Sequence, residues 1–216
     1  MRKCISNAYF KALVFDCDGV LFDSKEANRA YYNALLAAVG LPPMTEEQLA
    51  FAHCHTVFEV IDYLIPDPKL RQQAYKAREK LNYSNFLSYM RPEPYVKEAL
   101  SAFKRVFKLG MATSRTNTIY RLLEIYDLRS FFDLIISALD VQRPKPHPEA
   151  LYKIMDAFKI KNDELIYVGD AEVDAEMAKS AGVTFVSYKR PDLPADIYVN
   201  NFLELAEVLG ISLKEE

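Results

Sequence analysis

Short apolar runs alternate with segments of helical periodicity along most of this chain. The apolar runs have the length of buried strands and span residues 11–16, 109–114, 134–137, 165–170 and 184–188, with 196–199 as a further candidate. Apolar residues recur at helical spacing in residues 94–108, 116–126, 148–158, 173–181 and 202–209. Strands that alternate with helices are typical of a parallel sheet with helices on both faces. The pattern therefore predicts an α/β fold built on a doubly wound parallel sheet.

One segment, residues 23–91, departs from this alternation. It shows no convincing strand pattern, although it lies between the first and second predicted strands. Helical periodicity covers residues 26–39, 57–65 and 69–90, and Thr45 and Gln48 have the spacing of a capping box for a short helix. We therefore expect a Rossmann-like catalytic core made of residues 1–22 and 92–216, and an inserted α-helical cap domain made of residues 23–91.

The composition narrows the possible partners and surroundings. Of the 216 residues, 50% are hydrophobic and 26% are charged, as is usual for globular proteins. The net charge of −3 does not favour a nucleic-acid partner. No apolar run approaches the roughly 18 residues of a membrane span, and the first ten residues lack the pattern of a signal peptide. Three cysteines without a pairing pattern favour a reducing compartment, so we expect a cytoplasmic protein without nucleic-acid or membrane partners.

Polar side chains lie where the predicted strands end. They are Asp16, Asp18, Thr113, Ser114, Lys145, Asp170 and, one helical turn further on, Asp174. Because the carboxyl ends of parallel strands lie at one edge of a sheet, we expect these side chains to converge. Four carboxylates against one ammonium group leave an excess of negative charge, and hard oxygen ligands suit Mg²⁺. The sequence therefore predicts a Mg²⁺ site at this edge.

A metal beside a lysine and a helix N-terminus makes a site for an anion with several oxygens, and we expect a phosphate. Thr113 can donate its hydroxyl to that phosphate. The backbone amides of Ser114 and Arg115 are expected to point the same way, at the start of a helix that begins at Thr116. The Arg115 side chain either contacts the substrate or lies at the rim.

Four motifs resemble those of the haloacid dehalogenase (HAD) superfamily, in its phosphatase branch with a helical cap. DCDGV at 16–20 is similar to the first family motif, and ATS at 112–114 to the second. RPKPHPE at 143–149 resembles the third, with Lys145 in the lysine position, and GDAEVD at 169–174 resembles the fourth. Together, in this order, they cover nearly the whole chain.

The resemblance implies a role for each residue. Asp16 would be the nucleophile that forms an aspartyl-phosphate, and Asp18 would act first as general acid and then as general base. The Asp16 carboxylate, the backbone carbonyl of Asp18 and Asp170 would hold Mg²⁺, with Asp174 behind them or acting through a water. Lys145 would neutralise Asp16 and the transferred phosphoryl group.

The sequence His53-Cys54-His55 could suggest a metal site, but its spacing is poor for zinc. By its place between two cap helices, the segment resembles the substrate-specificity loop of the family. His55 or His53 is therefore a candidate substrate contact, and the alternative is a polar turn. His147 is expected to serve the entry into the following helix rather than chemistry.

These inferences predict a Mg²⁺-dependent phosphatase of small phosphorylated metabolites, similar to phosphoglycolate phosphatases. A phosphomutase of the beta-phosphoglucomutase type is the main alternative, because the resemblance implies that such enzymes use the same four motifs. A dehalogenase is disfavoured, since that branch lacks the counterpart of Asp18, and no cap lysine that a phosphonatase would need is identified. The non-enzyme alternatives are a phospho-receiver domain and an inactive scaffold. The oligomeric state stays open.

Overall fold

The computed structural model describes residues 9–213, except for the side chains of His53 and Cys54. The chain forms two compact units. One comprises the residues up to Phe22 together with those from Pro92 onward, and the other comprises Asp23–Arg91. Two short strands at these boundaries, β2 (Phe22–Asp23) and β3 (Arg91–Pro92), pair with each other in a two-stranded sheet. Among the described residues, no helix has the length and apolar character needed to cross a bilayer.

The first unit contains a six-stranded sheet in the order β5-β4-β1-β6-β7-β8. The strands are β1 (Ala12–Phe15), β4 (Lys108–Ala112), β5 (Leu134–Ile136), β6 (Leu165–Gly169), β7 (Thr184–Tyr188) and β8 (Ile197–Val199), and all five pairings are parallel. The chain builds the sheet outward from β1 to β5 and then returns to the other side of β1 with β6. The strand order thus reverses beside β1, where doubly wound folds bind ligands. The predicted α/β class and all six predicted strands are confirmed.

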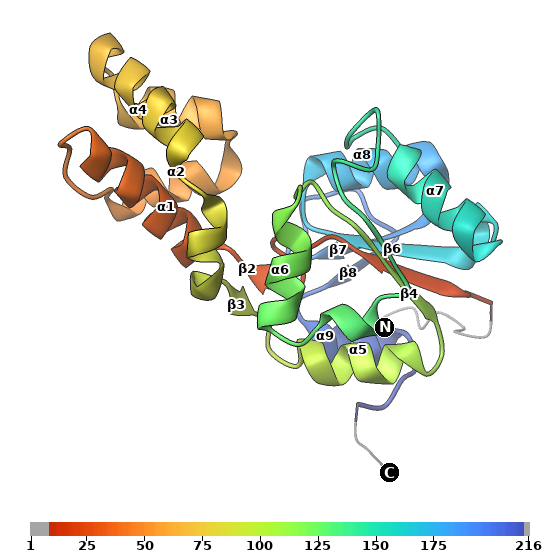
Figure 1. Ribbon diagram of the computed structural model, residues 1–216. Helices are drawn as coiled ribbons and strands as arrows, with labels where there is room; N and C mark the ends of the chain where they lie inside the picture. The colour runs from red at the N-terminus through yellow and green to blue at the C-terminus, as the bar shows by residue number, and fades with distance from the viewer. Residues whose placement is uncertain (1–8, 214–216) are drawn as a thin grey trace. The chain divides into compact units, whose positions relative to one another are not determined.

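Helices cover both faces of this sheet. α7 (Glu149–Phe158) and α8 (Glu172–Ala181) lie on one side, and α5 (Val96–Lys104) and α9 (Phe202–Val208) on the other (Figure 1). Successive residues of a strand point to opposite faces. Accordingly, Val14 packs in the cluster under α7 and α8, while Phe15 meets Phe103 and Phe202 under α5 and α9. α6 (Thr118–Ile125) follows β4.

The second unit consists of α1 (Lys25–Ala38), α2 (Glu46–Cys54), α3 (Val57–Leu64), α4 (Pro68–Lys80) and the 3₁₀ helix η1 (Tyr83–Tyr89). It has its own apolar core, to which α1 contributes Leu35 and α3 contributes Ile61. The predicted capping box is present: Thr45 Oγ1 accepts from the Gln48 amide, and Gln48 Oε1 accepts from the Thr45 amide.

The prediction of a single long helix over residues 69–90 is wrong. α4 ends at Lys80, and both Leu81 and Asn82 have extended backbones, with φ/ψ of −87°/107° and −81°/115°. The Asn82 side chain accepts a hydrogen bond from the Ser84 amide at 2.9 Å and starts η1. Asparagine favours caps over helix interiors because its side chain competes for backbone groups. The apolar spacing continues across this break, which is why periodicity alone did not show it.

Candidate active site

The carboxyl edge of the central strands brings three carboxylates together. Asp16 directly follows β1, Asp170 directly follows β6, and Asp174 lies in the first turn of α8. One ligand atom from each of the three lies within 4.8 Å of the others. Thr113 follows β4, on the other side of β1, and is buried. Of the four acidic residues expected to converge, Asp16, Asp170 and Asp174 lie together.

Lys145 lies between two of these carboxylates. Its ammonium nitrogen is 2.8 Å from Asp16 Oδ1 and 2.8 Å from Asp174 Oδ1, and only 5% of its side chain is exposed. The loop that carries Lys145 is held by the Glu149 carboxylate, which accepts from the amides of Gln142 and Arg143 at 3.0 Å each. The Lys145–Pro146 peptide bond is cis. As expected, His147 serves the helix entry, because its Nδ1 accepts from the Glu149 amide at 3.2 Å.

Asp174 is fully buried and accepts four hydrogen bonds. Its Oδ2 accepts from the amides of Asp170 and Ala171, at 3.2 and 3.1 Å. Its Oδ1 accepts from Lys145 at 2.8 Å and from the Tyr167 hydroxyl at 2.7 Å. Sequence reasoning missed Tyr167, because a tyrosine in an apolar strand reads as core packing.

The electrostatics of the cluster leave negative charge uncompensated. Burial raises the pKa of Asp170 to about 8, and the nearby Asp16 and Asp174 carboxylates add to that effect. Burial also raises the pKa of Asp16, even though Lys145 opposes the shift. For Lys145, burial disfavours the charged form, but Asp16 and Asp174 together outweigh it and raise the pKa. One ammonium group is thus too little positive charge for these three carboxylates.

These residues fit a hard divalent cation. Lys145 forms an ion pair with Asp16 Oδ1, but among the described residues no donor has hydrogen-bond geometry toward that buried oxygen. Carboxylate oxygens are the preferred ligands of such cations. Gly19 keeps the adjacent space open: its φ is +77°, and a Cβ atom there would overlap the Asp170 carboxylate. The role of this glycine in making room was not visible in the motif.

Asp18 is paired with Arg115. Arg115 Nε and Nη2 donate to the two carboxylate oxygens of Asp18 at 2.7 Å each, and only 8% of the arginine side chain is exposed. Arg115 was expected either to contact the substrate or to lie at the rim. The structure places it against Asp18, 97 residues earlier in the chain.

The expectation about the amides after β4 is corrected. α6 begins at Thr118, two residues later than predicted. The Arg115 amide donates to Thr113 Oγ1 at 3.1 Å, so it is engaged in a local turn and not at the N-terminus of a helix. The Ser114 side chain is exposed, and no described contact ties it to the carboxylates.

In the other unit, His55 follows α2 and is exposed. Its ring stacks on Phe51 with 3.7 Å between centroids, and its Nδ1 lies 2.8 Å from the Phe51 carbonyl oxygen. Because a carbonyl oxygen can only accept, Nδ1 is the donor of this hydrogen bond. The side chain of His53 lies outside the described residues.

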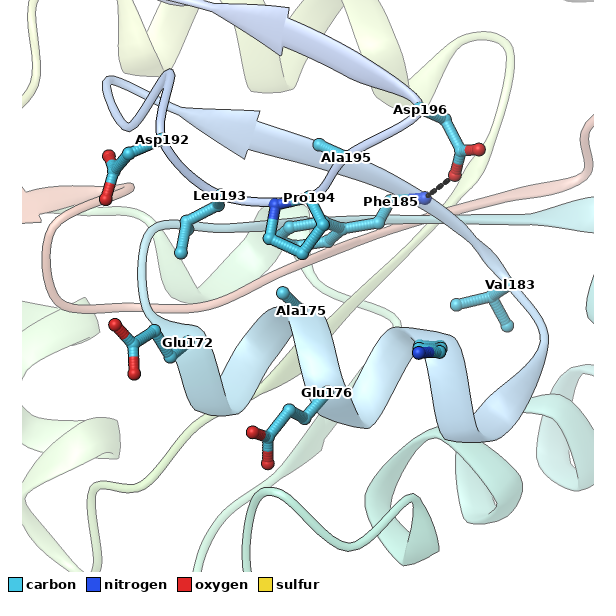
Figure 2. Close-up of a pocket in the computed structure, with 11 residues that line it drawn as sticks. Glu172, Ala175, Glu176, Val183, Phe185, Asp192, Leu193, Pro194, Ala195 and Asp196 are labelled. Atoms are coloured by element: carbon cyan, nitrogen blue, oxygen red, sulfur yellow. Dashed lines mark hydrogen bonds between the residues drawn. The ribbon is translucent and has the colours of Figure 1, made fainter.

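A groove of the first unit lies elsewhere. It has a volume of about 830 Å³ and lies between α8 and the chain that joins β7 to β8 (Figure 2). Phe185 and Leu193 contribute apolar surface, and Glu172 and Glu176 extend from α8. Neither the three carboxylates nor Lys145 is among the residues that line it. This groove therefore does not coincide with the candidate site.

Residues 13–188 match the model of the haloacid dehalogenase-like hydrolase family. The chain belongs to this family. A phosphoglycolate phosphatase from Photorhabdus laumondii is 30% identical over 223 aligned positions, which cover 94% of this chain and 94% of that protein. A HAD-superfamily hydrolase of subfamily IA, variant 1, from Geobacter sulfurreducens is 36% identical, with a TM-score of 0.87 over 94% of this chain and 97% of that one.

The fold is also that of a candidate beta-phosphoglucomutase from Thermotoga maritima, at 22% identity and a TM-score of 0.75 over 93% of this chain and 99% of that one. At this identity the likeness concerns the fold alone. Membership of the family confirms the resemblance drawn from the four motifs, and with the phosphatase relatives it confirms the enzyme class, a phosphoric monoester hydrolase.

Proposed function

We propose that this chain is a Mg²⁺-dependent phosphatase that hydrolyses small phosphomonoesters through an aspartyl-phosphate on Asp16. The observation that carries the proposal is the cluster of Asp16, Asp170 and Asp174, in which the Lys145 ammonium group is paired with Asp16 and Asp174. Such a cluster destabilises the folded protein unless a cation offsets its charge, because like charges at short range resist joint ionisation. It suits a site that binds a dication and a phosphate together.

In this proposal the Asp16 carboxylate attacks phosphorus, and the bond to the leaving oxygen breaks. Lys145, at 2.8 Å from Asp16, offsets negative charge on the attacking carboxylate and on the transferred group. Asp18 protonates the leaving oxygen and then takes a proton from the water that hydrolyses the aspartyl-phosphate. Arg115 orients the Asp18 carboxylate through two hydrogen bonds, and in this proposal it is a candidate contact for the substrate phosphate.

The metal would be held by the carboxylates of Asp16 and Asp170 and by the backbone carbonyl of Asp18. When bound, Mg²⁺ supplies positive charge to the phosphate oxygens. Asp174, whose oxygens already accept four hydrogen bonds, supports these ligands from behind. Thr113, and Ser114 with it, would complete the phosphate site.

The substrate class rests on the relatives. Several curated relatives are phosphoglycolate phosphatases, one of them matched over nearly the whole chain. We therefore place small phosphorylated metabolites, phosphoglycolate among them, as substrates. In this proposal the residues up to 22 and from 92 onward are the catalytic core, and 23–91 are a cap that selects the leaving group, with His55 as its candidate contact. A cytoplasmic location is consistent with the buried free thiol of Cys17 beside Asp16.

The test is a panel of phosphomonoesters, including phosphoglycolate, hexose phosphates and p-nitrophenyl phosphate, with and without Mg²⁺. We expect release of inorganic phosphate that requires Mg²⁺, and loss of turnover in Asp16→Asn with an unchanged circular dichroism spectrum. Conversion of a hexose phosphate into its isomer without phosphate release would favour a phosphomutase instead. Turnover of Asp16→Asn at the wild-type rate would rule out Asp16 as the nucleophile.

A further inference from the structure

A buried phenol lies directly behind the carboxylate cluster. Tyr167 is in the middle of β6 and has no exposed surface. Its hydroxyl is 2.7 Å from Asp174 Oδ1 and 3.4 Å from the Ala112 carbonyl oxygen. A phenol has one proton to donate, and the shorter bond to a charged acceptor is the stronger one. The hydroxyl therefore donates to Asp174.

The oxygen that receives this hydrogen bond is the one that also holds Lys145. Asp174 Oδ1 accepts from the Lys145 ammonium at 2.8 Å, and the same ammonium is 2.8 Å from Asp16 Oδ1. The ring of Tyr167 also faces Lys145, with the nitrogen 5.5 Å from the ring centroid. Tyr167 thus touches both partners that determine where the positive charge lies beside Asp16.

The rest of Tyr167 is held rigidly. The ring belongs to the apolar cluster under α7 and α8, and it stacks on Phe185 with 6.2 Å between centroids. A side chain packed in this way brings its hydroxyl to a fixed point, and a fixed donor restricts the rotamer of the carboxylate that accepts from it. Simple packing would be served equally well by phenylalanine, which lacks the hydroxyl.

We propose that Tyr167 is a positioning residue of the phosphatase: its hydroxyl fixes Asp174 so that Asp174 and the tyrosine ring hold Lys145 against Asp16. This inference rests on the proposed roles of Asp16 and Lys145. It assigns a function to a residue outside the four motifs. The hydroxyl does not touch the reacting atoms, and its effect passes through Asp174 and Lys145.

The chain offers a matched control in Tyr188. It lies in the neighbouring strand β7, is equally buried, and donates its hydroxyl to the Glu93 carboxylate at 3.2 Å. Neither Glu93 nor Tyr188 belongs to the carboxylate cluster. Tyr167→Phe and Tyr188→Phe therefore remove the same group from the same kind of environment, but only the first removes it from behind Lys145.

The experiment compares wild type, Tyr167→Phe and Tyr188→Phe with p-nitrophenyl phosphate at saturating Mg²⁺. We expect kcat of Tyr167→Phe to fall by about tenfold or more, with KM within a factor of about two, as for other residues that orient a catalytic group. We expect kcat of Tyr188→Phe to stay within about twofold of wild type. Urea unfolding midpoints should fall by similar amounts in both variants, since both lose one buried hydrogen bond.

A second readout does not depend on activity. Acylation of lysines in the metal-free protein, followed by peptide mass spectrometry, measures how firmly Lys145 is held, with the 79% exposed Lys159 as internal reference. We expect faster labelling of Lys145 in Tyr167→Phe and unchanged labelling in Tyr188→Phe. Wild-type kcat and labelling in Tyr167→Phe would overturn the inference, as would equal losses of kcat in both variants. An inactive wild type would instead contradict the proposed function.

Discussion

Replacing Gly19 with alanine should disable the site while the fold survives. Gly19 follows Asp18 and has a φ of +77°, a backbone conformation that residues with a Cβ atom rarely adopt. A Cβ there would lie 2.9 Å from Asp170 Oδ1 and still closer to Oδ2, whereas ordinary contact begins at 3.4 Å. The methyl group and the Asp170 carboxylate cannot both keep their places.

The size of the effect follows from these contacts. The left-handed conformation costs an alanine about 1–2 kcal/mol. To relieve the overlap, the Asp170 carboxylate must retreat by roughly an ångström, and Mg²⁺ binds oxygen only within a narrow range near about 2.0–2.1 Å. Loss of that ligand should lower kcat/KM by about 100-fold or more and raise the Mg²⁺ concentration needed for half-maximal activity.

Gly210 supplies the control. It lies in the same unit, has a φ of +65°, and a Cβ added there would meet nothing within 4 Å. Gly210→Ala should carry the same backbone strain, which lowers the melting temperature by about 2–8 °C in a protein of this size. Activity should be unchanged. Mg²⁺-dependent hydrolysis of p-nitrophenyl phosphate by Gly19→Ala at the rate of Gly210→Ala would refute the reasoning about Asp170.

Two further predictions concern the carboxylates and the break after α4. Burial raises the pKa of Asp170 from 3.8 to about 8 and that of Asp16 to about 7, so the metal-free protein should lose stability as pH rises from about 4 to about 8. The rise in melting temperature on adding Mg²⁺ should therefore be larger near pH 8 than near pH 6. Scanning calorimetry that finds an equal rise at both pH values would contradict this prediction. Asn82→Ala, which removes the acceptor for the Ser84 amide, should lower the free energy of unfolding by about 1 kcal/mol without changing activity, measured by urea denaturation; no loss of stability would show that this cap is not needed.

The sheet could be predicted because each strand carries its own local signal. An apolar run such as 165–170 has the length of a buried strand, and the polar residue at its end marks the carboxyl edge. Parallel topology then brings Asp16 and Asp170 to neighbouring strands without further information, because β1 pairs with β6. Residues at strand ends are thus the part of a site that sequence reasoning reaches most easily.

The contacts that sequence reasoning missed depend on side-chain direction over long distances. Arg115 and Asp18 are 97 residues apart, and nothing in either local pattern shows that their side chains meet. The hydroxyl of Tyr167 reaches Asp174 only because the turn after β6 folds α8 back over the strand end. The break at Asn82 was missed for a different reason, since one polar side chain outweighs a periodicity that continues on both sides.

The residues around the carboxylate cluster are constrained by the charge of the cluster rather than by packing in the apolar core. Burial raises the pKa values of Asp16 and Asp170, so the metal-free site opposes folding at neutral pH. Such a site keeps its geometry only if the surrounding groups hold each carboxylate in place. Gly19 leaves the space that Asp170 occupies, and Tyr167 with two backbone amides fixes Asp174. Gly19 and Tyr167 therefore constrain the carboxylate cluster, although neither of them carries a charge.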